Sequence, residues 1–203
     1  MTGPRLNVPP GRAGRLWLDR RLGAARRGAD LLDRKLRILQ AELGGLRAVA
    51  ARTEREWRAR SAEAERMLLI AALLGGQRAI RLAAAGGDAE ARVDYAVTIG
   101  VRHPARGSYL PPGPAPWAGQ PAERARLAHQ AALTAAVSHA VAAGAVRILE
   151  SETTATRYRL RAIRDRLIPS LEQARAEVAL AIDEFERADG ARLRRIRGKD
   201  LRP

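Results

Sequence analysis

The chain has 203 residues, and its 37 Lys and Arg residues outnumber 22 Asp and Glu to give a formal net charge of +15. It contains no cysteine, which excludes disulfides, thiolate metal sites and a cysteine nucleophile. Aromatic residues make up only 3% of the chain, while alanine and leucine supply most of its hydrophobic content. This composition is typical of long helices and coiled coils and not of a compact enzyme core.

The N-terminal part of the chain carries a sustained heptad pattern. From Leu18 to Leu74, positions spaced alternately four and three residues apart are apolar, with Thr53 and Arg60 as the exceptions. Such heptads predict a coiled-coil helix on the order of 85 Å long, assigned to residues 1–80. A Gly44–Gly45 pair inside it lowers helix propensity by about 1–2 kcal/mol and is expected at a close crossing or a bend.

A small head with a short β-hairpin is predicted for residues 81–140. Apolar residues alternate with other residues at a period of two, which indicates one strand of the head. These strand residues are Val93, Tyr95, Val97, Ile99 and Val101. Pro104 and Gly107 are expected to turn the chain so that residues 108–110 return as a partner strand. A proline-rich loop follows, and Pro121 suits the first turn of a new helix.

A C-terminal coiled-coil helix is predicted for residues 141–203. Its apolar residues follow heptad-like spacing up to Ile163 and then an eleven-residue 4-4-3 spacing up to Ile196. Pairing this helix with a heptad helix predicts weak supercoiling. Pro169 removes one backbone hydrogen bond, so a local kink of the helix is expected there. The predicted fold is mainly α: a long antiparallel two-helix coiled coil of the N- and C-terminal helices, with the head between them.

The excess positive charge lies at the two ends of the chain. Residues 1–40 carry a net charge of +7 and residues 186–203 a net charge of +4. Antiparallel helices would bring both ends to one tip, either as solvated faces or as a surface for an acidic or anionic partner. The first 30 residues show no secretory signal. Residues 127–146 lack charged side chains but are mostly alanine, so we expect a helix buried against protein and no membrane span.

No catalytic, metal or cofactor site is predicted. His103, His129 and His139 lack the spacing of a helical metal pair, and no phosphate-binding loop is present. The positive charge would favour non-specific nucleic-acid binding. However, few aromatic residues accompany the arginines, and no basic region precedes a separate zipper. A basic coiled-coil nucleic-acid-binding protein is therefore kept as an alternative function. Nucleic acid is not the partner that we expect.

Motifs in both terminal helices and in a short central piece resemble one known protein family. The N-terminal residues that carry the resemblance are Pro10-Gly11-Arg12, Leu16, Arg20-Arg21-Leu22, Ala25, Arg27-Gly28, Leu31-Leu32, Lys35 and Leu39. The C-terminal ones are Glu152-Thr153, Ile168-Pro169 and the basic stretch Arg192-Leu193-Arg194-Arg195-Ile196-Arg197-Gly198-Lys199. Ile99-Gly100-Val101 with Pro104 resembles part of a central hairpin. The family that these motifs resemble is the D subunit of V-type (archaeal and bacterial A/V-type) ATPases.

The resemblance implies a non-catalytic rotor shaft, the central stalk of a rotary ATPase or ATP synthase, without a cofactor. Its helices would thread a ring of alternating catalytic and regulatory subunits, and its head would bind a small companion rotor subunit and a socket on the membrane ring. The protein would be peripheral, on the cytoplasmic side of the membrane. Pro169 would then set the curvature of the shaft. The residues predicted to contact the ring are Arg12, Arg15, Arg192, Arg194, Arg195 and Arg197.

Overall fold

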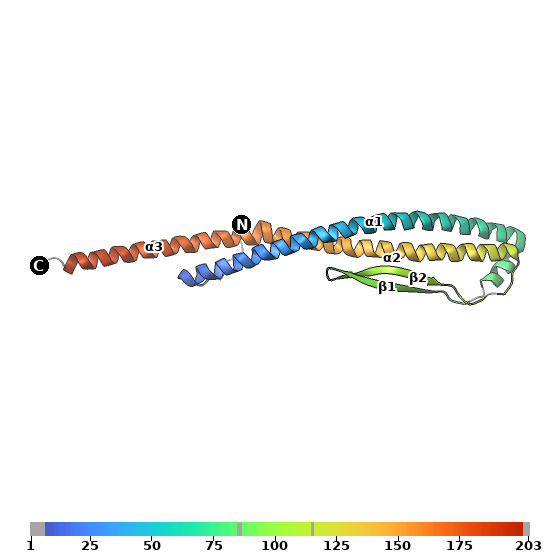
Figure 1. The fold of residues 1–203 in the computed structure, drawn as a ribbon, viewed down its shortest axis with the longest axis horizontal. Helices are drawn as coiled ribbons and strands as arrows, with labels where there is room; N and C mark the ends of the chain where they lie inside the picture. Colours follow the sequence, from blue (N-terminus) through green and yellow to red (C-terminus); the bar gives the residue numbers. More distant parts are fainter. Residues whose placement is uncertain (1–6, 85–86, 115, 201–203) are drawn as a thin grey trace. The chain divides into compact units, whose positions relative to one another are not determined.

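The computed structural model describes residues 7–84, 87–114 and 116–200, the last four without their side chains. In chain order the elements are helix α1 (Gly11–Ala83), strands β1 (Glu90–Thr98) and β2 (Val101–Leu110), helix α2 (Gln120–Ala162), the π-helical turn η1 (Ile163–Leu167) and helix α3 (Ile168–Asp200) (Figure 1). The mainly α fold with a two-stranded hairpin between the helices is as the sequence predicts.

The chain forms two compact units, each of which contains part of α1 and part of the C-terminal helix. One unit comprises Met1–Leu36 with Ala155–Pro203, and the other comprises Arg37–Thr154. We call them the terminal unit and the hairpin unit. The units cut across the three segments expected from the sequence, because helices pair with helices distant in the chain. In addition, the C-terminal helix already begins at Gln120, inside the segment assigned to the head.

In the terminal unit, α1 packs antiparallel against α3. Leu18, Leu22 and Ala25 of the heptad pattern are buried against Leu171. Ion pairs show the direction: Arg12 meets Glu186 at 2.7 Å, Arg26 meets Glu172 at 2.7 Å, and Asp33 meets Arg164 at 3.4 Å. Residue numbers rise along one helix as they fall along the other, so the predicted antiparallel pairing is confirmed.

Pro169 follows directly after the π-helical turn η1. Proline lacks the N–H that an α-helix needs, and its ring crowds the carbonyl four residues earlier. That carbonyl belongs to Asp165, which lies within η1. The wider π turn gives the ring room without ending the helix. The irregularity expected at Pro169 is thus a π turn immediately before it, and its effect on curvature stays a prediction.

In the hairpin unit, the second part of α1 packs against α2. Leu39 and Leu43 are buried with Leu149, and further along the seam most buried residues are alanines. Those alanines are Ala64, Ala71, Ala79, Ala122, Ala125, Ala132, Ala135, Ala142 and Ala145. Small side chains on both surfaces allow the two helices to approach closely.

Residues 120–196 form the one described helical stretch long and apolar enough to pass a length-and-composition test for a membrane span, with a mean hydropathy of 1.5 in its best window. Core helices pass the same test. A third of that window is buried within the protein. Ala132, Ala135, Ala142 and Ala145 of α2 are buried, so the burial expected of this helix holds for part of the window.

The hairpin turns earlier than the sequence suggests. Ile99 and Gly100 form a two-residue turn with φ of 47° and 77°, so the expected turn at Pro104–Gly107 is wrong. Two consecutive positive φ values produce the tight turn that matches strand twist, and Gly100 adopts this conformation without strain. Ile99 consequently lies in the turn, and Val101 begins β2 and does not continue β1.

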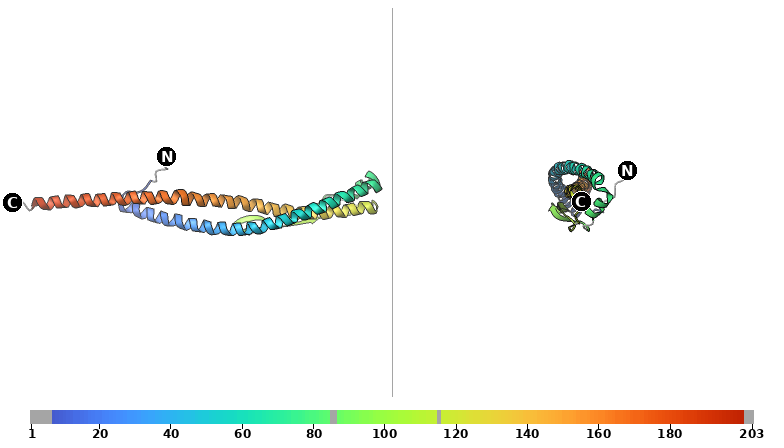
Figure 2. Two further views of the ribbon diagram at one scale, coloured as in Figure 1. Left: turned by 90° about the horizontal axis from the view of Figure 1, so that it is seen from above. Right: turned by 90° about the vertical axis from the view of Figure 1, so that its right-hand side faces the viewer.

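Pro104 and Gly107 have different roles from the turn expected of them. Pro104 lies within β2, where the pairing with β1 is interrupted by a bulge between Asp94 and Tyr95. A proline is tolerated there because β2 is an edge strand. Gly107 allows β2 to lie close against α2, since a Cβ atom would come within 2.8 Å of Val137 Cγ1. In Figures 1 and 2 the hairpin accordingly runs alongside α2.

Candidate functional site

In the terminal unit, the end of α3 has no partner helix among the residues that the structure describes. Figures 1 and 2 show α3 continuing beyond the first residues of α1. Arg12, in the first turn of α1, already faces Glu186 of α3, so residues 187–200 extend past the start of α1. We call the first turn of α1 and residues 185–196 of α3 the terminal surface.

Two of the six predicted contact arginines are held in ion pairs within this chain. Arg12 binds Glu186, and this hydrogen bond and the carboxylate charge raise the pKa of Arg12 above its ordinary value. Arg192 reaches Asp189 at 3.4 Å, one helical turn away. Both pairs are largely exposed, so they are screened by solvent and contribute little to stability.

The remaining predicted arginines are oriented to solvent wherever they are described. Arg15, Arg194 and Arg195 are exposed and have no ion-pair partner among the described side chains. Arg197 belongs to α3, but its side chain lies outside the described residues. The terminal surface thus keeps uncompensated positive charge where an acidic partner could reach it.

The predicted arginines of α1 and those of α3 lie at two different positions along the axis of α3. Arg192 and Arg195 lie six and nine residues beyond Glu186, the residue that faces Arg12, which corresponds to about 9–14 Å along a helix. The single basic tip expected from the sequence is therefore two neighbouring groups. The offset arises because Pro9 and Pro10 precede α1, which begins at Gly11, whereas α3 continues.

Exposed apolar side chains accompany these arginines, and the sequence analysis missed their exposure. Phe185 is 64% exposed, and Leu193 and Ile196 are each 58% exposed. Sequence periodicity placed all three on the seam with α1, but α1 does not extend far enough to cover them. An open groove of about 1040 Å³ begins here, lined in part by Pro9, Ile182, Phe185 and Leu193. Only the pairing register, which periodicity does not reveal, could have shown this.

The hairpin presents a second exposed apolar surface. Val93, Tyr95 and Val97 of β1 are 40%, 54% and 66% exposed, respectively. The guanidinium of Arg102 lies over the Tyr95 ring, 4.4 Å from its centroid. Of the five predicted strand residues, these three share a face, whereas Val101 packs against the buried cluster around Leu149.

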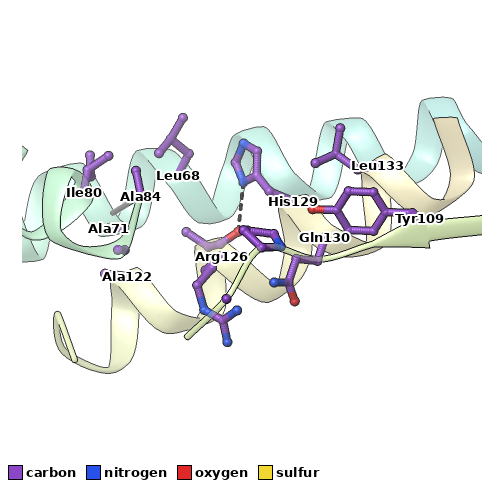
Figure 3. Close-up of a pocket in the computed structure, with 14 residues that line it drawn as sticks. Leu68, Ala71, Ile80, Ala84, Tyr109, Ala122, Arg126, His129, Gln130 and Leu133 are labelled. Carbon is purple, nitrogen blue, oxygen red and sulfur yellow. Dashed lines mark hydrogen bonds between the residues drawn. The ribbon is translucent and has the colours of Figure 1, made fainter. Parts of the chain in front are cut away.

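A pocket of about 300 Å³ lies in the hairpin unit between the end of α1 and α2 (Figure 3). It exists because Gly76 breaks the helical backbone, with φ 68° and ψ 175°, and redirects the last turns of α1. Leu68 and Ile80 lie on one side of the view, and Arg126 and Gln130 lie on the other.

Two of the polar side chains that line this pocket, His129 and Arg126, are held by partners in α2. His129 donates from Nδ1 to the carbonyl oxygen of Ala125 at 2.8 Å. Arg126 binds Glu123, and this hydrogen bond lowers the pKa of the Glu123 carboxyl. No group of three or more His, Cys, Asp or Glu side chains suited to a metal ion gathers in the described ranges. The pocket therefore suits an apolar group more than it suits acid–base chemistry.

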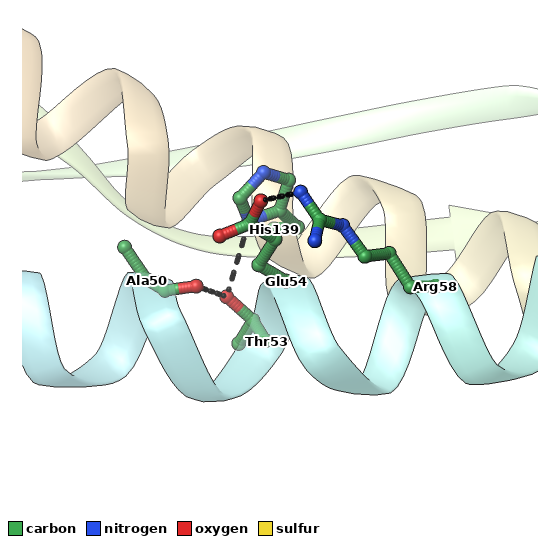
Figure 4. Close-up of polar contacts among 5 residues, drawn as sticks. All are labelled: Ala50, Thr53, Glu54, Arg58 and His139. Carbon is green, nitrogen blue, oxygen red and sulfur yellow. Dashed lines mark hydrogen bonds and ion pairs between the residues drawn. The ribbon is translucent and has the colours of Figure 1, made fainter.

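A polar layer crosses the helix pair of the hairpin unit at the heptad exception Thr53 (Figure 4). The Thr53 hydroxyl donates to a carbonyl of its own helix, that of Ala50 at 3.0 Å. It can therefore accept from His139 Nδ1 of α2, which lies 3.5 Å away. His139 also stacks on Trp57, with ring centroids 5.4 Å apart and planes 10° from parallel. The contacts of His139 with Thr53 and Trp57 therefore join α2 to α1.

Comparison with known proteins agrees with the helix–hairpin–helix arrangement. The family model for the D subunit of ATP synthase matches residues 16–198. The D subunit of a V-type ATP synthase from Anaeromyxobacter dehalogenans (strain 2CP-1 / ATCC BAA-258) is 31% identical over 212 residues, covering 95% of this chain and 96% of the relative. The corresponding protein of strain 2CP-C is 32% identical with the same coverage. The chain therefore belongs to the ATP synthase D-subunit family.

Proposed function

We propose that this protein is the non-catalytic central shaft of a V-type ATP synthase or ATPase and transmits torque between the catalytic ring and the membrane ring. The observation that carries the proposal is the terminal surface, on which an apolar helix face is exposed and Arg194 and Arg195 have no ion-pair partner among the described side chains. Large apolar side chains exposed together with charge are typical of a protein interface. Membership of the D-subunit family supports the same role.

The terminal surface is proposed to contact the surrounding ring of catalytic and regulatory subunits. Phe185, Leu193 and Ile196 would supply apolar contacts, while Arg194 and Arg195 would supply long side chains that adapt to successive ring positions. The same proposal has the ring contacted by four further arginines, Arg12, Arg15, Arg192 and Arg197.

The hairpin unit is proposed to serve the remaining partners. It exposes Leu69, Leu73 and Leu74 before the break at Gly76, and these are 64%, 84% and 73% exposed. This unit would contact a small companion rotor subunit and a socket on the membrane ring. The protein would accordingly be peripheral on the cytoplasmic side of the membrane. Pro169, with η1 before it, would set local shaft curvature.

The ring contact is tested by charge reversal at the end of α3. We would co-express the chain with the catalytic and regulatory subunits of the same complex and measure copurification. Replacing Arg192, Arg194 and Arg195 with Glu is expected to lower recovery of the chain on the ring at least tenfold. The control replaces Arg52 and Arg55 with Glu in the same way. Both are exposed on α1 in the hairpin unit, so recovery should stay unchanged. Equal recovery of both variants and the wild type would exclude the assigned contact.

The nucleic-acid alternative is distinguished in the same preparation. A shaft is expected at one copy per ring, with weak and salt-sensitive retention of DNA. A basic coiled-coil nucleic-acid-binding protein would instead bind DNA strongly, with an affinity that falls steeply with salt, and would not copurify with the ring. Strong DNA retention without ring binding would reverse the assignment.

A further inference from the structure

One flank of α1 in the terminal unit carries charges that alternate in sign at intervals of seven residues. In chain order they are Arg12, Asp19, Arg26 and Asp33. Seven residues correspond to almost two helical turns, so all four lie on the same side of the helix. Each side chain is directed at α3 or η1, because each makes an ion pair across the helix interface.

All four ion pairs join opposite charges in the observed register. Arg12 pairs with Glu186 at 2.7 Å, and Arg26 pairs with Glu172 at 2.7 Å. In the other two pairs α1 supplies the acidic residue: Asp19 pairs with Arg175 at 2.5 Å, and Asp33 pairs with Arg164 at 3.4 Å. The sign pattern on the C-terminal helix is therefore the complement of the pattern on α1.

The apolar seam penalises a one-heptad slip less than it penalises a shift by one residue. A slip of seven residues replaces Leu18 by Ala25 and Leu22 by Ala29, which are apolar residues at equivalent positions. The hydrophobic effect depends on buried apolar area and not on direction, so it tolerates such a shift better than a shift by one residue. Smaller alanines in place of these leucines would still lose packing against Leu171, and the flanking charges add a second penalty.

The alternating charges supply that penalty in both directions. Sliding α1 by one heptad one way brings Arg12 opposite Arg175, Asp19 opposite Glu172, and Arg26 opposite Arg164. Sliding it the other way brings Asp19 opposite Glu186, Arg26 opposite Arg175, and Asp33 opposite Glu172. In each direction, all three pairs that form among these eight residues are like-charge pairs, and like charges at coiled-coil flanks select against a pairing.

We propose that Arg12, Asp19, Arg26 and Asp33, with their four partners, form a register lock that prevents the two helices from sliding past each other by whole heptads. A row of identical signs would stabilise the native pairing equally, but it would also accept every one-heptad slip. The inference concerns this chain by itself and does not require the proposed function. If the chain is a shaft, helices that slid past each other would yield under load and would transmit less torque.

The test compares two charge-swapped proteins that both retain opposite charges in the native register. The aligned variant carries Asp19→Arg with Arg175→Asp, and Asp33→Arg with Arg164→Asp, so that α1 presents four positive charges in a row. The inverted variant carries these changes and also exchanges both Arg–Glu pairs, Arg12 with Glu186 and Arg26 with Glu172. It therefore preserves alternation with every sign reversed.

Register is read from the distance between two spin labels by pulsed electron paramagnetic resonance. The absence of native cysteine allows labels at Arg20→Cys on α1 and Leu180→Cys on α3, both exposed in the terminal unit. A one-heptad slip displaces one helix by about 10 Å along the other. Circular dichroism verifies that all proteins remain helical.

The lock predicts one distance for the wild type and the inverted variant, and a second, displaced component for the aligned variant. In about 1 M salt, where the screening length falls to about 3 Å, the wild type should begin to show the same second component. A single unchanged distance in the aligned variant and in high salt would overturn the proposal. It would also be overturned if the inverted variant slipped as readily as the aligned one.

Discussion

Thr153 on α2 is the one buried side chain in the described ranges whose polar atom lacks a hydrogen-bond partner. It is 4% exposed, and its Oγ1 meets no donor or acceptor. A hydroxyl buried without a partner has lost its water and costs about 1–3 kcal/mol. Thr153→Val removes the hydroxyl while nearly keeping the shape, and the two residues have similar helix propensities. We expect the free energy of unfolding to rise by about 1–2 kcal/mol.

Thermal unfolding followed by circular dichroism measures this gain, which corresponds to a rise in Tm of about 2–8 °C for a chain of this size. Thr156→Val is the matched control on the same helix. Thr156 is buried, as Thr153 is, but it makes a polar interaction, so its replacement should lower the free energy of unfolding by about 1 kcal/mol. If the two variants shift Tm in the same direction, or if Thr153→Val lowers it, the reasoning from the orphan hydroxyl is wrong.

Two further predictions concern glycines and pH. Gly107→Ala should lower Tm and reduce the free energy of unfolding by about 1–3 kcal/mol, because the added Cβ would press on Val137. Gly44 has open space around it, so Gly44→Ala should raise Tm and increase the free energy of unfolding by up to about 1 kcal/mol through better helix propensity. A lower Tm for both variants would contradict the packing argument. Arg126 lowers the pKa of Glu123, so the stabilisation from this pair is present above the ordinary value of 4.5 and is lost as pH falls through the lowered pKa. Arg126→Gln should raise the Glu123 pKa in a carboxyl-carbon NMR titration, and an unchanged titration would show that the hydrogen bond is not its cause.

The fold class followed from patterns that are local in the sequence. Heptad spacing from Leu18 onward predicted the first helix because side chains seven residues apart share one helical face. The alternation of Val93, Tyr95 and Val97 predicted a strand for the equivalent reason. The π turn before Pro169 is also a local consequence, since the proline ring and its missing N–H act within one turn of the helix.

The turn of the hairpin could not be located as well from the sequence. Pro104 and Gly107 are typical turn residues, but here one lies at a bulge in an edge strand and the other allows close approach to α2. The actual turn uses Ile99, which is unusual at positive φ, with Gly100 beside it. Strand pairing and contact with α2 decided between turns that were both possible locally.

The sequence by itself determined that this protein is built from long helices with charged ends, because amphipathic periodicity and composition are properties of the chain alone. Only the tertiary structure decided which of those charges and apolar residues are free. Arg12 is neutralised by Glu186, 174 positions away, whereas Leu193 is left uncovered because α1 begins too late to reach it. The pairing register sets both outcomes, and it depends on matching two surfaces far apart in the chain.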